Sequence, residues 1–313
     1  MFMAGRLYGE AEFAKDPQTK QKELLYTLLK QQAWQTSPDG SPVTPQIAPK
    51  TDKSYIQVAR VGQRVVLAAR EFVEQEIRSL ESKAPTASGA EAEALQASVL
   101  SWRERLRLLK GTWNYVVVKS PVPNAFVSEL SPRNIFVNEG LVAGLSVSDD
   151  ELALVLGHEL SHLLHGHMSE RLATSTAVNL LQLVLLNLLD PFGVSTIFAM
   201  GVMAKFATYE LASHSRQNES EADETGLRIA ALACFDTKKA PKVFGKLHEM
   251  ERKARDDAGQ KTQRIAGWGD THPMPKDREG ILIAMSQTVN KESLGNCNEL
   301  RKKFNVLGLD VHF

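Results

Sequence analysis

Two histidines and a glutamate stand close together in the segment HELSH, where His158 and His162 are four residues apart and Glu159 follows the first of them. In a helix this spacing puts both imidazoles on one face, a few ångströms apart, as two ligands of a tetrahedral zinc ion require. Glu159 then lies alongside, where it could hold the attacking water. The alternative is a pair of surface histidines on an ordinary helix, and a third ligand would decide between the two.

The third ligand has to come from farther along the chain. A pattern HExxHxxGxxH would supply it nearby, but position 165 is His and position 168 is Met. The best candidate lies in SRQNESEADETGL, where Glu219 and Asp223 are four residues apart on a predicted helix and Glu221 points elsewhere. Glu219 could complete a His-His-Glu zinc site. Asp223 could accept a hydrogen bond from the free N–H of a zinc-bound histidine, or it could be a solvated charge.

A His-His-Glu site leaves the fourth position of zinc for water, whose pKa the metal lowers toward neutrality. Glu159 would take a proton from that water as it attacks a peptide carbonyl. The predicted reaction is therefore peptide hydrolysis without a covalent intermediate, with one Zn2+ per chain. His165 and His167 are too close to His162 to share its metal in good geometry, and we expect them to support the site or to pack near it.

The segment that carries HELSH is predicted to be a helix. Ser148 and Glu151 match the capping box that begins a helix, and apolar residues then recur at helical spacing. Two more helices are expected before it, one beginning near Ser54 and one over about 95–110. An exposed, low-complexity loop over 83–93 separates them.

A short β region is predicted ahead of the HELSH helix. Segments rich in valine and aromatic residues predict strands over 113–119, 124–130 and 134–137, and the Ser-Pro-Arg sequence at 131–133 predicts the turn of a hairpin. After this region the pattern is almost entirely helical. The fold class is therefore α+β, mostly helical, with a small β-sheet before the HExxH helix.

Composition limits the classes of function. Lys plus Arg and Asp plus Glu each total 37, so the net charge is zero and we expect no nucleic-acid partner. Residues 37–50 hold four prolines and a glycine, which indicates an N-terminal arm and Pro-rich linker over 1–50 ahead of one domain over 51–313. Cys234 and Cys297 could be two buried thiols or a disulfide, and the latter requires an oxidising compartment.

Two uncharged stretches follow the HELSH helix, over 172–189 and 192–204. The first contains several polar residues, and the second is too short for a bilayer-spanning helix of about twenty apolar residues. We therefore expect a helical hairpin insertion at about 172–205, lying over the active site. It could be part of the core, enter the bilayer interface, or act as a lid. The first thirty residues lack the pattern of a secretory signal, so the chain could be a mature or truncated form.

With HELSH, SRQNESEAD and THP, the chain resembles the membrane-associated zinc peptidases that include the CaaX prenyl proteases, the HtpX heat-shock proteases and the mitochondrial Oma-type peptidases. The similarity is closest to the Oma type and covers about residues 110–297. It implies a zincin-like metallopeptidase domain. In that family the HExxH pair and the glutamate of SRxxExxADxxG bind zinc, and these positions are His158, His162 and Glu219 here.

The same resemblance gives roles to residues that spacing alone leaves unassigned. The motif THPxxxxR falls on His272 and Arg278; it implies that His272 approaches the metal to stabilise the oxyanion and that Arg278 supports the ligands. Alone, His272 would be an ordinary loop histidine before a proline. Asn124, Ala125 and Phe126 match an edge strand that binds an extended substrate by β-addition, although the family's usual Pro-Gly-Gly after it is replaced here.

The resemblance also indicates where such a protein works. We expect a zinc-dependent metalloendopeptidase acting on protein substrates, chiefly membrane proteins, in quality control or a stress response at the mitochondrial inner membrane. Another membrane-associated location and a homo-oligomer stay open. Two alternative functions remain: a membrane-associated chaperone or scaffold with a structural zinc, and a peptidase of the bacterial-envelope type.

Overall fold

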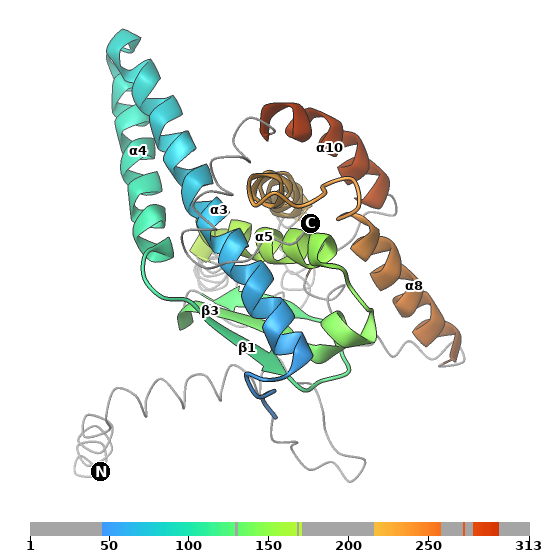
Figure 1. Ribbon diagram of the computed structural model, residues 1–313. Coiled ribbons are helices and arrows are strands. Elements are labelled where there is room, and N and C mark those ends of the chain that lie inside the picture. Colours follow the sequence, from blue (N-terminus) through green and yellow to red (C-terminus); the bar gives the residue numbers. More distant parts are fainter. Residues whose placement is uncertain are drawn as a thin grey trace, which may run out of the picture.

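The computed structural model describes residues 46–128, 131–167, 169–170, 216–257, 272 and 278–293. Within these ranges the fold is mostly helical with one small sheet, as predicted (Figure 1). In chain order the elements are α3 (Lys53–Lys83), the 3-10 turn η1 (Ala84–Thr86), α4 (Ala90–Leu109), β1 (Asn114–Val118), β2 (Ala125–Ser128), β3 (Ser131–Asn138), the π-helical turn η2 (Gly140–Gly144), α5 (Asp149–His165), α8 (Lys242–Asp257) and α10 (Arg278–Ser293). A further helix runs over 216–232, between α5 and α8.

The predicted helical pair before the sheet is α3 and α4, which pack side by side and project from the body (Figure 1). Asp52 caps α3, because its side chain accepts a hydrogen bond from the backbone N–H of Ser54 at 2.8 Å. α4 begins at Ala90, earlier than the predicted start near 95, since alternating Ala and Glu favour a helix and Gly89 makes the turn with a φ of 58°. The predicted loop over 83–93 is correspondingly shorter.

The three strands form a sheet in the order β1-β3-β2, with β1 parallel and β2 antiparallel to β3. The predicted hairpin is present as β2 and β3, but the predicted turn over 131–133 is wrong, because these residues already belong to β3. The cause is a register shift after Val127 that pairs Ser128 with Ser131. Arg133, with a φ of 61°, lies inside the strand instead of in a turn.

The two outer strands of the sheet differ in what lies along them. Residues 46–48 run beside β1, where the N–H of Ala48 donates to the carbonyl of Val117 and that of Lys119 donates to the carbonyl of Gln46, both at 2.8 Å. This is the part of the predicted N-terminal arm that the structure describes. In the described part of the chain, no strand pairs with the outer edge of β2.

α5 is the central helix of the fold and packs against α3 and β2. The predicted capping box at Ser148 and Glu151 is confirmed, and Gly166 ends the helix in a left-handed conformation. All residues from Glu151 to Ser161 are buried. A helix that is buried on every side belongs to the interior, so HELSH lies within the body of the protein.

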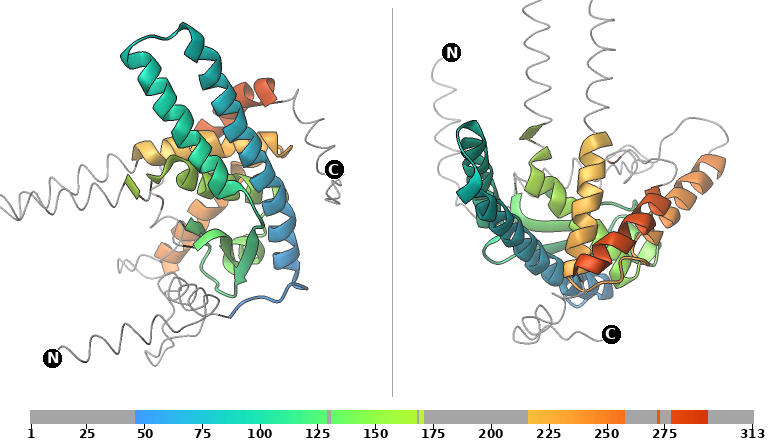
Figure 2. Two further views of the ribbon diagram at one scale, coloured as in Figure 1. Left: turned by 90° about the vertical axis from the view of Figure 1, so that its left-hand side faces the viewer. Right: turned by 90° about the horizontal axis from the view of Figure 1, so that it is seen from above.

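The helix over 216–232 lies between α5 and the pair formed by α8 and α10, while α3 and α4 lie on the other side (Figure 2). Side chains hold its far end in place. Arg64 of α3 donates to the carbonyl of Ala233 at 2.7 Å, and Asp150 of α5 accepts from the N–H of Asp236 at 2.9 Å. These contacts fix the orientation of the helix relative to α5.

Several sequence predictions fall on residues that the structure does not describe. The helical hairpin expected at about 172–205 is one of them. The choice between thiol and disulfide at Cys297 is another. Cys234 is disulfide-bonded, so it is not the free thiol that the sequence also allowed. None of the helices in the described ranges combines the length and the apolar character that crossing a membrane requires.

Candidate metal centre

Two glycines allow the helices of the site to approach closely. A Cβ atom at Gly157 of α5 would lie 2.7 Å from the carbonyl oxygen of Gly226, and one at Gly226 would lie 2.7 Å from the backbone nitrogen of His158. The helices therefore touch backbone to backbone. Glu219 and Asp223, two turns and one turn before Gly226, are thereby brought onto the histidines of α5.

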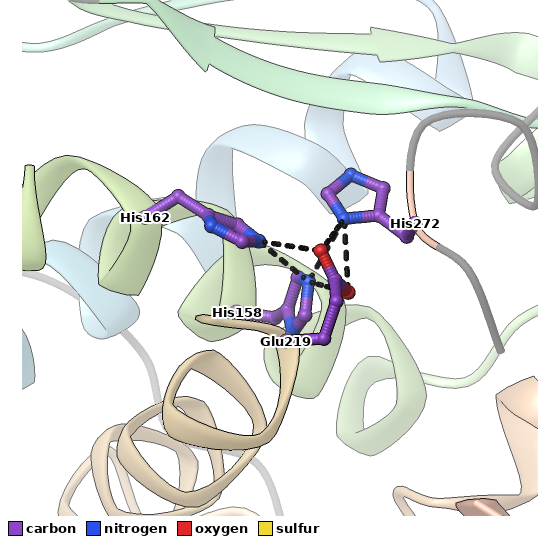
Figure 3. A group of neighbouring side chains, drawn as sticks. All are labelled: His158, His162, Glu219 and His272. Carbon is purple, nitrogen blue, oxygen red and sulfur yellow. Dashed lines mark hydrogen bonds and ion pairs between the residues drawn. The ribbon is translucent and has the colours of Figure 1, made fainter. Parts of the chain in front are cut away.

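The three predicted ligands come together. The Nε2 atoms of His158 and His162 are 3.0 Å apart, and each lies 3.4 Å from a carboxylate oxygen of Glu219. Figure 3 shows these side chains pointing toward one another, two from α5 and one from the helix over 216–232. One ligand atom from each could hold the same metal ion.

His272 is the fourth member of this group (Figure 3). Its Nδ1 atom lies 3.0 Å from Glu219 Oε1 and 3.2 Å from His158 Nε2, and its Nε2 atom lies 3.2 Å from Glu159 Oε1. The ring therefore joins the ligand group to the predicted base. The oxyanion role that the resemblance implies for His272 stays a prediction.

Asp223 and Arg278 lie behind His158. The Oδ1 atom of Asp223 is 3.0 Å from His158 Nδ1, and Arg278 Nε donates to the other oxygen at 2.8 Å while its Nη2 donates to Oδ1. The guanidinium also stacks 4.1 Å from the ring centre of Phe244 in α8. A carboxylate at Nδ1 favours a proton on that atom, which leaves the lone pair of Nε2 directed at the metal position.

The protonation states suit metal binding. Burial opposes the charge on Glu219, but hydrogen bonds from His158, His162 and His272 more than offset it and hold the pKa of Glu219 below its usual range. Burial lowers the pKa of His162 to about 4, which keeps it neutral. Both residues therefore have the forms that act as metal ligands.

Glu159 and His272 form the charged pair of the site. Burial opposes both charges, but attraction to His272 lowers the pKa of Glu159, and attraction to Glu159 raises the pKa of His272 to about 9. Glu159 is only 4% exposed. A buried, ionised carboxylate beside the ligand group can accept a proton.

The predicted substrate strand lies next to the HELSH helix, because β2 packs against α5. Asn124 precedes it and accepts a hydrogen bond from the N–H of Asn138 at 2.8 Å, while Ala125 and Phe126 belong to β2. Hydrogen bonds alternate along an antiparallel pair, so the N–H and C=O groups of Ala125 and Val127 point away from β3.

A second group of side chains lies beside the ligands, and it includes His165 and His167, which we expected to support the site or to pack near it. His167 Nδ1 lies 2.8 Å from His162 Nδ1, and His167 Nε2 lies 3.0 Å from Glu221 Oε2. His165 Nδ1 lies 3.1 Å from Glu221 Oε1. The spacing of the two histidines was visible in the sequence, but their carboxylate partner comes from another helix more than fifty residues away.

An HExxH helix, a glutamate from a second helix and a sheet beside them define the class of HExxH metallopeptidases. The comparison with protein families agrees, since residues 90–282 match the model of Peptidase family M48. The chain belongs to this family, and the resemblance drawn from the motifs is confirmed.

Curated relatives include metalloendopeptidases and a bacterial protease. The mitochondrial metalloendopeptidase OMA1 of Arabidopsis thaliana is 33% identical over 171 residues, which are 55% of this chain and 31% of the relative. The mitochondrial metalloendopeptidase OMA1 of Danio rerio is 33% identical over 198 residues, 61% of this chain and 39% of the relative. The beta-barrel assembly-enhancing protease of Yersinia pestis is 30% identical over 138 residues, which are 42% of this chain and 26% of the relative. The chain thus spans well under half the length of these relatives.

Proposed function

We propose that this chain is a zinc-dependent metalloendopeptidase whose metal is held by His158, His162 and Glu219. The observation that carries the proposal is the spacing of the donor atoms. Zn–N and Zn–O bonds of about 2.0–2.2 Å put the ligands of a tetrahedral zinc about 3.3–3.6 Å apart. The donor atoms lie 3.0–3.4 Å from one another. Two imidazoles with one carboxylate suit zinc better than calcium or magnesium, which prefer oxygen ligands.

The chemistry follows from the residues around that position. Bound zinc would supply a water of lowered pKa and would polarise the peptide carbonyl. Glu159 accepts the proton of the attacking water and can return it to the leaving amine. Asp223 holds the tautomer of His158, and Arg278 holds Asp223. The outer edge of β2 offers backbone groups to an extended substrate.

Glu159 favours an enzyme over a scaffold with structural zinc. A zinc that only holds helices together needs its ligands alone, and burying an additional ionised carboxylate next to it costs free energy. Such a group is retained at a cost where it performs a chemical step. The buried carboxylate of Glu159 therefore supports a peptidase over a chaperone or scaffold.

His272 would stabilise the oxyanion. Despite the burial of its ring, attraction to Glu159 raises its pKa to about 9, and a doubly protonated imidazole has no lone pair for a metal, so His158, His162 and Glu219 would leave one position of the zinc open. We propose that the charged ring of His272, which lies beside the ligand group in Figure 3, faces the oxyanion that forms there.

The names of the relatives support a finer proposal. OMA1 proteins of several species are named mitochondrial metalloendopeptidases. We propose that this chain cleaves membrane proteins at the mitochondrial inner membrane in quality control or a stress response, by analogy with its relatives. A role of the bacterial-envelope type is the alternative, which the similarity to the Yersinia pestis protease supports.

Removal and replacement of the metal test the proposal. The purified chain is treated with a chelator, and cleavage of an unfolded protein is followed after adding back Zn2+, Ca2+ or Mg2+. We expect the chelated protein to be inactive and Zn2+ alone to restore cleavage. Cleavage that persists without metal, or that Ca2+ restores equally well, would contradict the assignment of zinc.

A further inference from the structure

Beside the predicted zinc site lies a group that the proposed reaction does not use: His165, His167 and Glu221, here called the second histidine group. The two oxygens of the Glu221 carboxylate face one ring nitrogen each, Nδ1 of His165 at 3.1 Å and Nε2 of His167 at 3.0 Å. One ligand atom from each residue lies within 4.8 Å of the others, as binding of a common metal requires.

The surroundings of this group fit a site that metal can enter. His167 is buried, with 6% exposure, whereas the side chain of Glu221 is 50% exposed. The other nitrogen of His165 is held by Thr225 Oγ1 at 3.1 Å, and its ring meets Trp102 edge-on at 5.6 Å. The group therefore combines fixed imidazoles inside with a carboxylate that reaches solvent.

We propose that the second histidine group is a second site for a divalent transition metal such as Zn2+, and that metal binding there opposes metal binding at the first site. Two imidazoles and one carboxylate are the same donor set as His158, His162 and Glu219. The side chain of Glu221 is 50% exposed and that of Glu219 is 8% exposed. Solvent therefore screens the attraction of Glu221 for a cation more strongly, which makes the second site the weaker of the two.

Metal binding at one site opposes binding at the other because His162 and His167 share one proton between their Nδ1 atoms. His162 Nδ1 and His167 Nδ1 lie 2.8 Å apart, a distance at which one of them must carry a proton and the other must accept it. Zinc on Nε2 of His162 leaves the proton on its Nδ1. His167 then has to accept at Nδ1, and its own proton is on Nε2, directed at Glu221.

Metal on Nε2 of His167 requires the reverse arrangement. The proton of a neutral His167 is then on Nδ1 and meets the N–H of a zinc-bound His162, so two donors face each other. Both metals can bind only when one ring moves or loses its remaining proton. The second metal therefore binds more weakly when the first is present, and the first is weakened in turn by the same factor.

A zinc titration of the full chain against a chromophoric chelator tests the proposal. We expect two equivalents in the wild type, the second at least ten times weaker than the first. His165→Phe keeps an aromatic ring against Trp102 but removes a ligand, and Glu221→Gln removes the carboxylate. Each should lose the second equivalent and keep the first. His248→Phe, at an exposed histidine of α8, is the matched control and should bind both.

Thermal melting of each variant separates loss of a ligand from loss of the fold. A single equivalent in the wild type at millimolar Zn2+, or a second equivalent that survives both substitutions in folded protein, would overturn the second site. Two equivalents of equal affinity would overturn the opposition between the sites. The readout is metal binding, so failure of the proposed peptidase activity would appear separately, as two equivalents without proteolysis.

Discussion

His158 is the residue on which the site depends most, because it contacts both the other ligands and the residues behind them. Its Nε2 faces the ligand group, and its Nδ1 faces Asp223, which Arg278 holds from the start of α10. Ring orientation and tautomer are thus set by residues that do not touch the metal position themselves. Contacts of this kind tune both the affinity of a site for its metal and the basicity of the ligating histidine.

Asp223→Asn tests this orientation at the scale of one residue. The amide can turn its NH2 group toward His158 Nδ1, which favours the wrong tautomer, so zinc affinity should fall about 10–100-fold. The measurement is competition with a zinc chelator of known affinity. Glu224→Gln, on the same helix and half exposed, is the control. Unchanged affinity in Asp223→Asn would show that the carboxylate does not orient the ligand.

The ligand residues could be predicted from the sequence because their spacing is local. His158, Glu159 and His162 lie within five residues, and Glu219 was identified by its i,i+4 partner Asp223. His272 needed the family motif, because nothing in its neighbourhood distinguishes it from other loop histidines. The partnership of His167 with Glu221 could not be predicted, since it depends on how closely two helices approach.

At the scale of elements, that approach is set by Gly157 and Gly226. Gly226→Ala should stabilise its helix by about 1 kcal/mol, because alanine has a higher helix propensity than glycine. The substitution should nevertheless damage the site, because the added methyl group meets the backbone at His158. We expect the helices to separate and zinc affinity to fall at least tenfold, measured by chelator competition. Gly144→Ala, where a Cβ meets nothing within 4 Å, should leave the affinity unchanged.

The outer edge of β2 carries the second prediction for an element. Val127→Pro removes an N–H that points away from β3, so pairing with β3 should survive while pairing with a substrate is lost. We expect kcat/KM for an unfolded protein to fall at least tenfold with zinc content unchanged. Val127→Ala keeps the N–H and serves as control. Equal losses in both variants would point to the side chain instead of strand pairing.

Most elements were predicted correctly, and the wrong turn has a non-local cause. The cap at Ser148 and the apolar spacing after it are local signals, and α5 begins there as predicted. The turn over 131–133 was wrong because the register of β2 and β3 depends on pairing across the sheet. A Ser-Pro-Arg sequence favours a turn, but the neighbouring strand overrides that preference.

At the scale of the whole molecule, the predicted α+β class is confirmed, and the sheet lies before the HExxH helix in the chain as expected. The interior position of α5 explains how the site can work. Burial removes water from around Glu159 and the ligands, which strengthens the electrostatic interactions among them. The predicted hairpin at about 172–205 lies outside the described residues, and its place over the active site remains a prediction.

The most direct test of the account compares the wild-type chain with Glu159→Gln, measuring bound zinc and cleavage of an unfolded protein in the same preparations. The substitution leaves His158, His162 and Glu219 in place but removes the base. We predict one tightly bound zinc per chain in both proteins, with cleavage by the variant reduced about 10²–10⁴-fold. Equal cleavage by the two proteins, or no bound zinc in either, would contradict the central claim.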